Sequence, residues 1–372
     1  MLLACHIDNN NPLHACIADI ESKYKGLGIP VTYGILSVLA NKSVFFIAGR
    51  GVGKTRVISS IPHVEDHFET KFDTFTYGEL DTLCQSLAPN QTEMTENYLG
   101  GVENKKLVFI VKEFSTLSEY HREVFLTVCS RVALDGDYTH ITTVTPHLRF
   151  ENCKLSMLVA IQPRLYSQLC NRYTQWENMS SDRFTKFLLL NPLRQNITID
   201  EQFVATLPRE IPNAATLQNG LNMEKLVNLF EGQISGGRAY IYARDYAMAF
   251  ARLQGKTEVT QEDNELFYRL FSPYLQSFTI LQERANLEAS VTVSSGNIEL
   301  LVEIGKYPEG IAEGNLALSL MVTTRHIERG LGFLLAKDLI AERDNRYYLN
   351  DELQEFFTWY RDTLCRPNVA GE

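Results

Sequence analysis

The sequence predicts an α/β fold in which a mostly parallel sheet is followed by two smaller units. Three observations indicate this class. Short apolar runs alternate with helical patterns over residues 43–200, helical patterns alone fill residues 201–281, and a helix-rich stretch over residues 298–350 ends in a hairpin pattern. Strands that alternate with helices form parallel sheets whose two faces are covered by those helices.

The composition is that of an ordinary globular protein with room for two or three domains. The chain has 372 residues and a net charge of −10, so only a local patch would attract nucleic acid. Its seven cysteines are odd in number and include no C-x-x-C pair. This pattern favours a protein of a reducing compartment and argues against a disulfide framework or a zinc site. Because no signal peptide and no apolar run of about 20 residues is evident, we expect a soluble, cytoplasmic protein without a membrane partner.

The patterns divide the chain into five segments. Residues 1–42 are expected to form an N-terminal lead-in, 43–200 the sheet-bearing domain, 201–281 a helical lid, 282–297 a linker and 298–372 a C-terminal domain. The expected strands of the sheet are Val44–Ala48, Phe72–Tyr77, Leu107–Val111, Leu155–Ile161 and Phe187–Leu190. The expected helices of the lid are Met223–Glu231, Arg238–Gln254 and Gln261–Phe271.

The stretch Ser43–Ile58 is the most informative part of the chain. It reads SVFFIAGRGVGKTRVI, an apolar strand, a glycine-rich turn ending in Gly-Lys-Thr, and a helical pattern. Such a P-loop points backbone N–H groups at nucleotide phosphates, while its lysine reaches the β- and γ-phosphates and its hydroxyl binds Mg²⁺. Ala48 stands where the strict pattern has its first glycine. The predicted ATP-binding residues are Ala48, Gly49, Arg50, Gly51, Val52, Gly53, Lys54, Thr55 and Arg56, with Thr55 on Mg²⁺.

A second apolar strand, Leu107–Val111, ends at Lys112 and Glu113. At this place an Asp-Glu pair is expected, in which Asp holds the Mg²⁺ shell and Glu activates the attacking water. Glu113 is therefore predicted to be catalytic and to serve the metal. Lys112 cannot ligate Mg²⁺, so either Glu113 serves the metal, or the water is positioned by other means, or ATP is bound and turned over slowly.

Three further polar residues are candidates for the reaction. Gln162 follows the strand Leu155–Ile161, where it would orient the lytic water or be an ordinary surface residue. Arg183 would project across a subunit boundary to stabilise a neighbour's transferring phosphate, or be a solvated charge. Arg238 would reach over the nucleotide and sense the γ-phosphate, or cap the surface.

Together these motifs resemble those of an AAA+ ATPase over roughly residues 30–275. The elements Asp182-Arg183-Phe184 and residues 236–263, and an expected β-hairpin over residues 137–152, resemble the MoxR and MCM branch. The resemblance implies a P-loop AAA+ parallel sheet with a helical lid. It also implies Lys54 and Thr55 as Walker A, Glu113 as Walker B, Gln162 as sensor 1, Arg183 as arginine finger and Arg238 as sensor 2. A finger works only if a second subunit uses it, so a homo-oligomeric ring or filament is implied.

The C-terminal segment has the order of a winged-helix domain. Helical patterns at Ile298–Ile304, Ile311–Leu318 and Thr323–Leu335 precede a hairpin pattern with Asp344-Asn345 at its turn. Against DNA binding, residues 298–372 hold thirteen acids and eight bases. The candidate DNA contacts are Thr323, Thr324, Arg325, His326 and Arg329 of the presumed recognition helix and His140, His147 and Arg149 of the earlier hairpin.

Three functions follow from the sequence. The first is an ATPase that acts on DNA as a helicase, loader or initiator in replication, recombination or mobile-element biology. The second is a MoxR-like chaperone that remodels protein partners. The third is an ATP-gated scaffold with weak hydrolysis, because Lys112 replaces the expected aspartate.

Overall fold

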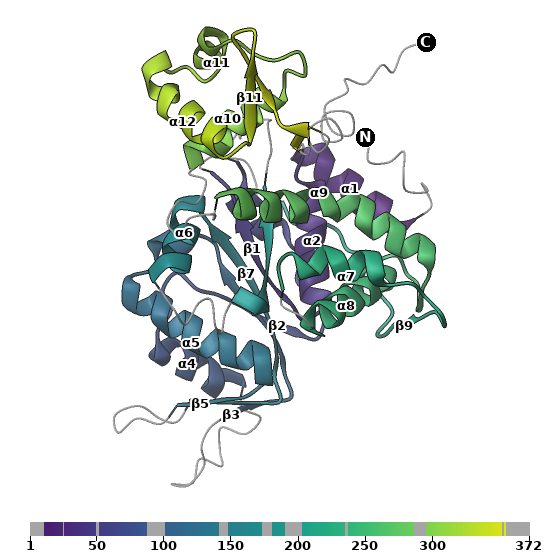
Figure 1. Ribbon diagram of the computed structural model, residues 1–372. Helices are drawn as coiled ribbons and strands as arrows, with labels where there is room; N and C mark the ends of the chain where they lie inside the picture. The colour runs from purple at the N-terminus through teal and green to yellow at the C-terminus, as the bar shows by residue number, and fades with distance from the viewer. Residues whose placement is uncertain are drawn as a thin grey trace.

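The computed structural model describes residues 11–24, 26–49, 52–87, 101–140, 148–172, 181–189, 203–234, 237–285, 295–351 and 353–354. At the centre of this described part lies a five-stranded sheet whose strands are all parallel, with helices packed around it (Figure 1). The α/β class is therefore confirmed. In order across the sheet the strands are β2 (His67–Lys71), β4 (Lys106–Val111), β7 (Lys154–Ile161), β1 (Ser43–Ile47) and β8 (Phe184–Leu188).

Three of the five predicted strands agree with the structure to within one residue, and two lie earlier in the chain than predicted. β2 precedes the predicted Phe72–Tyr77, and β8 begins three residues before the predicted Phe187–Leu190 and ends at Leu188. Phe72 and Phe75 are buried in the turn after β2, where both rings pack near Phe109. Their aromatic spacing imitates a strand although the residues serve the core from a loop.

Helices precede β1, and further helices and short 3-10 turns connect the later strands of the sheet. They are α1 (Pro12–Lys23), α2 (Gly28–Leu39), α3 (Lys54–Ser60), α4 (Tyr77–Leu87), η2 (Phe114–Thr116), α5 (Glu119–Asp135), α6 (Pro163–Arg172) and η4 (Ser181–Arg183).

Helix α2 is a core helix, although the sequence predicted only an N-terminal lead-in over residues 1–42. All its residues are buried, and it packs against β1, β7, α3 and α8. The segment GIPVTYGILSVL contains no charged residue. A helix that is apolar on every side must be covered on every side.

Three helices form the unit that follows the sheet: α7 (Glu224–Glu231), α8 (Gly237–Leu253) and α9 (Gln261–Ala285). Two short parallel strands, β9 (Thr216–Leu217) and β10 (Glu258–Val259), lie beside them. The structure corrects the end of α9, which continues through Pro273 into the predicted linker, whose residues 286–294 lie outside the described residues. Buried residues at helical spacing persist beyond Pro273, so packing outweighs the cost of the proline.

The predicted hairpin before β7 is confirmed at its base. β5 (Tyr138–His140) pairs antiparallel with β6 (Leu148–Glu151), and residues 141–147 lie outside the described part of the chain. The sequence did not predict β3 (Gly101–Glu103), which pairs parallel to β6 and, within the described residues, makes a three-stranded sheet. A three-residue strand is too short to leave a periodic pattern.

The last described unit contains α10 (Ser295–Gly305), α11 (Glu313–Ser319), α12 (Thr324–Ala336), β11 (Ile340–Arg343) and β12 (Arg346–Leu349). The two strands form an antiparallel hairpin, and Asp344 and Asn345 at its turn have φ values of 51° and 57°. A hairpin turn with two such residues matches the twist of the strands it joins. The three helices and the hairpin are as predicted. Asp351, Leu353 and Gln354 are helical, and the aromatic residues from 356 onward lie outside the described residues.

Aromatic rings fill the seam between β8 and the surrounding helices. The fully buried Phe187 stacks on Tyr33 of α2 at 4.6 Å and on Tyr274 of α9 at 4.7 Å, centroid to centroid. Tyr33 also stacks on Tyr246 of α8, at 5.2 Å. The sheet and helices α2, α8 and α9 therefore share one continuous core.

This packing predicts a large loss of stability when Phe187 is shortened. Phe187→Ala should lower the free energy of unfolding by about 3–5 kcal/mol, because it removes a fully buried ring and leaves a cavity. Urea denaturation followed by circular dichroism measures the change. A loss below about 1 kcal/mol would contradict the packing, and Phe68→Ala on the partly exposed edge strand β2 is the matched control.

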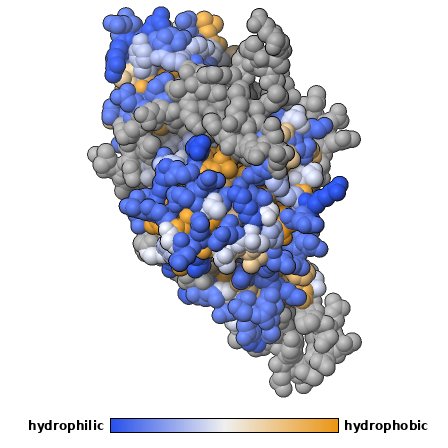
Figure 2. Space-filling model, turned by 90° about the vertical axis from the view of Figure 1, so that its right-hand side faces the viewer, coloured by the Kyte–Doolittle hydropathy of each residue, from blue (hydrophilic) through white to orange (hydrophobic). Residues whose placement is uncertain are grey.

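On the face shown in Figure 2, hydrophobic residues lie in small separate groups among hydrophilic ones. Within the described residues, no helix is long and apolar enough to cross a bilayer.

Candidate functional site

The carboxyl edge of the parallel sheet gathers three of the predicted site elements. β7 lies between β1 and β4, with Ile47 paired to Ile161 and Val159 paired to Val111. The residues that follow these strands therefore emerge at one edge. They are the P-loop after β1, Gln162 after β7 and Glu113 after β4. Strands in a sheet are about 4.8 Å apart, so Glu113 and the P-loop face each other across one intervening strand.

The P-loop adopts a tight strand-to-helix turn. Gly53, the residue before α3, has φ 109°, and a Cβ there would lie 3.2 Å from the side chain of Leu27. A side chain at this position would be both strained and crowded. The Lys54 Nζ is buried and donates to the carbonyl oxygens of Ala48 at 3.0 Å and Gly49 at 2.7 Å. Lys54 is thus folded over the loop it belongs to, where phosphates would lie.

The rest of the predicted P-loop set is placed as follows. Thr55 is exposed in the first turn of α3, and the Arg56 guanidinium lies 5.7 Å from the ring centroid of Tyr24. Val52 is half-buried. Arg50 and Gly51 lie outside the described residues.

A segment before the sheet braces this loop. The Glu21 carboxylate accepts hydrogen bonds from the backbone N–H groups of Gly26, at 2.8 Å, and Gly28, at 2.6 Å. Burial raises the pKa of Glu21, and those two hydrogen bonds lower it in part. They fix Leu27 against Gly53. No motif predicts this brace, because Glu21 bonds to backbone groups five and seven residues later in a turn.

The second predicted motif stands at the end of β4. Glu113 is half-buried and accepts a hydrogen bond from the Ser115 hydroxyl at 2.5 Å, which orients its carboxylate. Lys112 is also half-buried and forms no ion pair with any described residue. A cation therefore stands where a metal-binding carboxylate is expected, and Glu113 is the carboxylate that this strand end supplies.

Arg183 and Arg238 lie at the other edge of the sheet. Ser43, the first residue of β1, pairs with Phe184, the first residue of β8, and Arg183 directly precedes it. The P-loop follows the last residue of the same strand β1. A five-residue strand spans about 13 Å between its end residues, so Arg183 cannot touch phosphates bound at its own P-loop.

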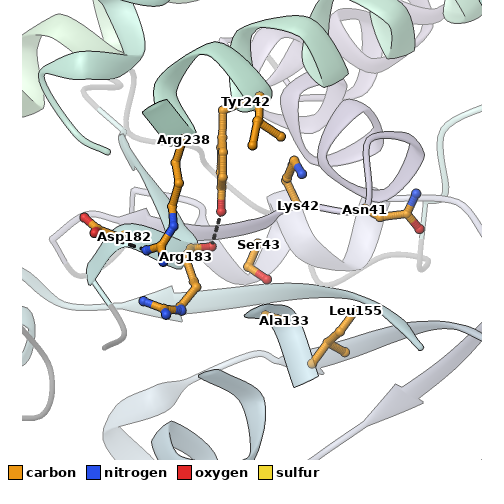
Figure 3. Close-up of a pocket in the computed structure, with 10 residues that line it drawn as sticks. Asn41, Lys42, Ser43, Ala133, Leu155, Asp182, Arg183, Arg238 and Tyr242 are labelled. Carbon is orange, nitrogen blue, oxygen red and sulfur yellow. Dashed lines mark hydrogen bonds and ion pairs between the residues drawn. The ribbon is translucent and has the colours of Figure 1, made fainter. Parts of the chain in front are cut away.

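Arg238 is placed beside Arg183 and not beside Lys54. Its Nη1 lies 3.3 Å from Oδ2 of Asp182, and both arginines line one cavity with Ser43 and Tyr242 (Figure 3). The sensing role predicted for Arg238 over its own nucleotide does not fit this placement. The long helix α8 starts at the amino-terminal edge of the sheet, which the sequence pattern alone could not reveal.

Tyr242 ties α8 to the start of β8. Its hydroxyl donates to the backbone carbonyl of Arg183 at 2.9 Å, as Figure 3 shows. Lys42, which precedes β1, pairs with Asp245 at 2.7 Å and lies 4.8 Å from the Tyr242 ring centroid. Lys42 and Tyr242 were missed by sequence reasoning, since neither belongs to a motif, and Asp182 was named only as part of the element that contains Arg183.

The candidate DNA contacts fall on two separate units. Arg149 on β6 is bound to Glu151 at 2.5 Å, which partly neutralises it. His140 is the last residue of β5, and His147 lies outside the described residues. At the start of α12 the side chains of Thr323, Thr324, Arg325, His326 and Arg329 are all exposed.

Cysteine chemistry is not favoured at four of the seven cysteines. Cys16, Cys84, Cys129 and Cys153 are buried and reduced. Burial raises the pKa of the Cys16 thiol to about 12 and also raises the pKa values of Cys129 and Cys153. Among the described residues no group of three or more His, Cys, Asp or Glu side chains could hold a metal ion.

The residues present fit a nucleoside triphosphate better than they fit a complete Mg²⁺ shell. The cradle at Gly53 admits no side chain, and Lys54 already lies against the loop carbonyls. Thr55 and Glu113 are the oxygen donors available for Mg²⁺, with Lys112 in the place of a third.

Comparison with known proteins gives little further guidance. No family model and no curated protein matches the chain. Among solved structures, it is similar to the Thermotoga maritima RuvB Holliday junction branch migration motor, with 12% identity over 88% of this chain and 93% of that one, and a TM-score of 0.22. A mutant of that protein matches with 11% identity, 91% and 97% coverage, and a TM-score of 0.23. Scores this low do not establish a shared fold, so the strand order and register above carry the description.

Proposed function

We propose that this protein is an AAA+ ATPase that binds Mg-ATP at its P-loop. The observation that carries the proposal is the strand order. Strand β7 lies between β1, which leads into the P-loop, and β4, which Glu113 follows. That order brings the P-loop, Gln162 and Glu113 to one edge of the sheet. Lys54 would hold the phosphates, Thr55 and Glu113 the Mg²⁺, and Gln162 the lytic water.

We further propose that ATP lies between subunits of a ring or filament. Arg183 and Arg238 lie at the sheet edge opposite their own P-loop, so any nucleotide phosphate that they contact belongs to another copy of the chain. In that copy the phosphates would meet both guanidinium groups, which bind phosphate oxygens with paired N–H donors. This arrangement supports Arg183 as the arginine finger and assigns Arg238 to the same neighbour.

Arg183→Ala should leave ATP binding intact and lower ATP turnover about 10³-fold, the lower end of the range for arginine fingers. Mixing it with Lys54→Ala chains should restore part of the turnover, because a subunit with an intact P-loop then sits beside one with an intact finger. Phosphate release from each variant and from the mixture measures this. Unchanged turnover in Arg183→Ala would mean that Arg183 does not act on a nucleotide at the subunit interface.

We propose that this ATPase acts on DNA. The three helices and hairpin of residues 295–351 have the order of a winged helix, and the exposed Thr323, Thr324, Arg325 and Arg329 occupy the position of its recognition helix. The acidic balance of this unit favours the second candidate, a protein partner. The third, an ATP-gated scaffold, is favoured by Lys112.

One experiment separates the three. The chain is sized by light scattering with ADP or a slowly hydrolysed ATP analogue, with and without single- and double-stranded DNA, and phosphate release is measured in parallel. Assembly with turnover that DNA stimulates, and that salt abolishes, supports a DNA-acting ATPase. Turnover indifferent to DNA supports a protein remodeller, and assembly with negligible turnover supports a scaffold.

A further inference from the structure

A cavity of about 160 Å³ lies at the amino-terminal edge of the sheet, between β1, the start of β8 and α8. Its volume is far above the roughly 10–15 Å³ that one water needs. Its polar walls carry the side chains of Lys42, Arg183 and Arg238 on three different elements, and Asp182 is the acid among its lining residues (Figure 3).

The charges around this cavity do not balance at Arg183. Lys42 is paired with Asp245 at 2.7 Å, and Arg238 is paired with Asp182 at 3.3 Å. The Arg183 side chain is only 7% exposed, and its Nε and Nη1 atoms have no hydrogen-bond partner in the described part of the chain. Arg183 is thus a buried cation with two N–H donors that lack an acceptor.

Such a group is costly unless something supplies the acceptor. A buried donor left unpaired loses its hydration without compensation, and a buried charge loses more. Burial lowers the pKa of Arg183, the nearby Arg238 lowers it further, and Asp182 raises it only in part. An anion in the cavity would balance the charge of Arg183, which lines it.

We propose that this cavity is an oxyanion site that binds free inorganic phosphate within a single chain. Arg183 is the main ligand, because its side chain lines the cavity and its charge forms no ion pair with a described residue. Arg238, whose contact with Asp182 is long and whose side chain is 38% exposed, is the second ligand. A guanidinium fork suits the paired oxygens of a tetrahedral oxyanion, and the start of the 17-residue helix α8 adds its positive dipole end.

The binding step is independent of nucleotide, but its consequence rests on the proposed function. While phosphate is bound, Arg183 stays inside its own subunit and is not offered to a neighbour. Free phosphate and the phosphates of a neighbour's nucleotide then compete for the guanidinium group of Arg183.

The test uses the full chain and inorganic phosphate, because a P-loop also binds free phosphate. The midpoint of thermal unfolding is measured in about 0–20 mM phosphate, with the ionic strength held constant by NaCl. The variants are Lys54→Ala, Arg183→Met, Arg183→Lys and, as a matched control, Arg269→Ala, an exposed arginine on α9 outside the cavity. Isothermal titration with phosphate gives the affinities.

Phosphate should raise the midpoint of Arg269→Ala as much as that of the wild type, and a rise should persist in Lys54→Ala after the P-loop contribution is lost. Arg183→Met should bind phosphate at least 10-fold more weakly, Arg183→Lys should be intermediate, and Arg183→Met should melt higher than the wild type in phosphate-free buffer, because a buried unpaired charge is removed. A response that disappears in Lys54→Ala but persists in Arg183→Met overturns the proposal, since the P-loop is then the phosphate site. So does the absence of any response in the wild type. Failure of the proposed function gives a different result, namely no Mg-ATP binding by the wild type.

Discussion

Lys54→Ala is expected to abolish Mg-ATP binding, with an affinity at least 100-fold below that of the wild type. The Lys54 Nζ lies within hydrogen-bond distance of two carbonyl oxygens of the P-loop and is the cation placed to reach the phosphates. Charge-assisted hydrogen bonds to phosphate are about twice as strong as neutral ones, so their loss is costly. Isothermal titration with Mg-ATP measures the change.

The matched control for this variant is Lys71→Ala. Lys71 ends β2 at the same edge of the sheet, is half exposed, and pairs only with Glu69, at 3.1 Å, among the described residues. It should bind Mg-ATP as the wild type does. Equal affinities for Lys54→Ala and the wild type would mean that the glycine-rich turn is a connection between strand and helix and not a phosphate site.

Glu113→Gln is expected to lower ATP turnover by about 10²–10³-fold while leaving ATP affinity within about threefold of the wild type. A general base contributes that much to proton transfer, and glutamine keeps the shape and the hydrogen bond from Ser115 but cannot accept the proton. Single-turnover phosphate release separates this effect from binding.

Lys112→Asp tests the same site in the opposite direction. A carboxylate at this strand end restores the missing oxygen ligand for the proposed Mg²⁺, so turnover should rise about tenfold.

If Glu113→Gln leaves turnover unchanged, Glu113 does not activate water, and the scaffold interpretation gains support.

The sequence predicted the centre of the fold well because the centre follows short-range patterns. β1, β4 and β7 are continuous apolar runs, and the hairpin turn at Asp344-Asn345 has a characteristic local sequence. The P-loop is likewise a local pattern. The sequence could therefore place Lys54 and Glu113 each at the end of a strand, while their meeting at one edge follows from the strand order.

What the sequence could not predict depends on contacts between distant segments. Arg238 follows a glycine-rich turn that gives no indication of which sheet edge α8 begins at. Lys42, Asp182 and Tyr242 come together around Arg183 from three parts of the chain. β2 was misplaced because Phe72 and Phe75 enter the core from a turn, and α9 continues beyond the predicted Phe271 because buried residues persist after Pro273.

The central claim is that the Lys54 loop holds a nucleoside triphosphate. Calorimetric titration of nucleotide-free wild-type protein with Mg-ATP, paired with a thermal melt, measures it most directly. We predict saturable heat with one nucleotide per chain and a higher melting midpoint. The absence of both heat and thermal protection would contradict the account.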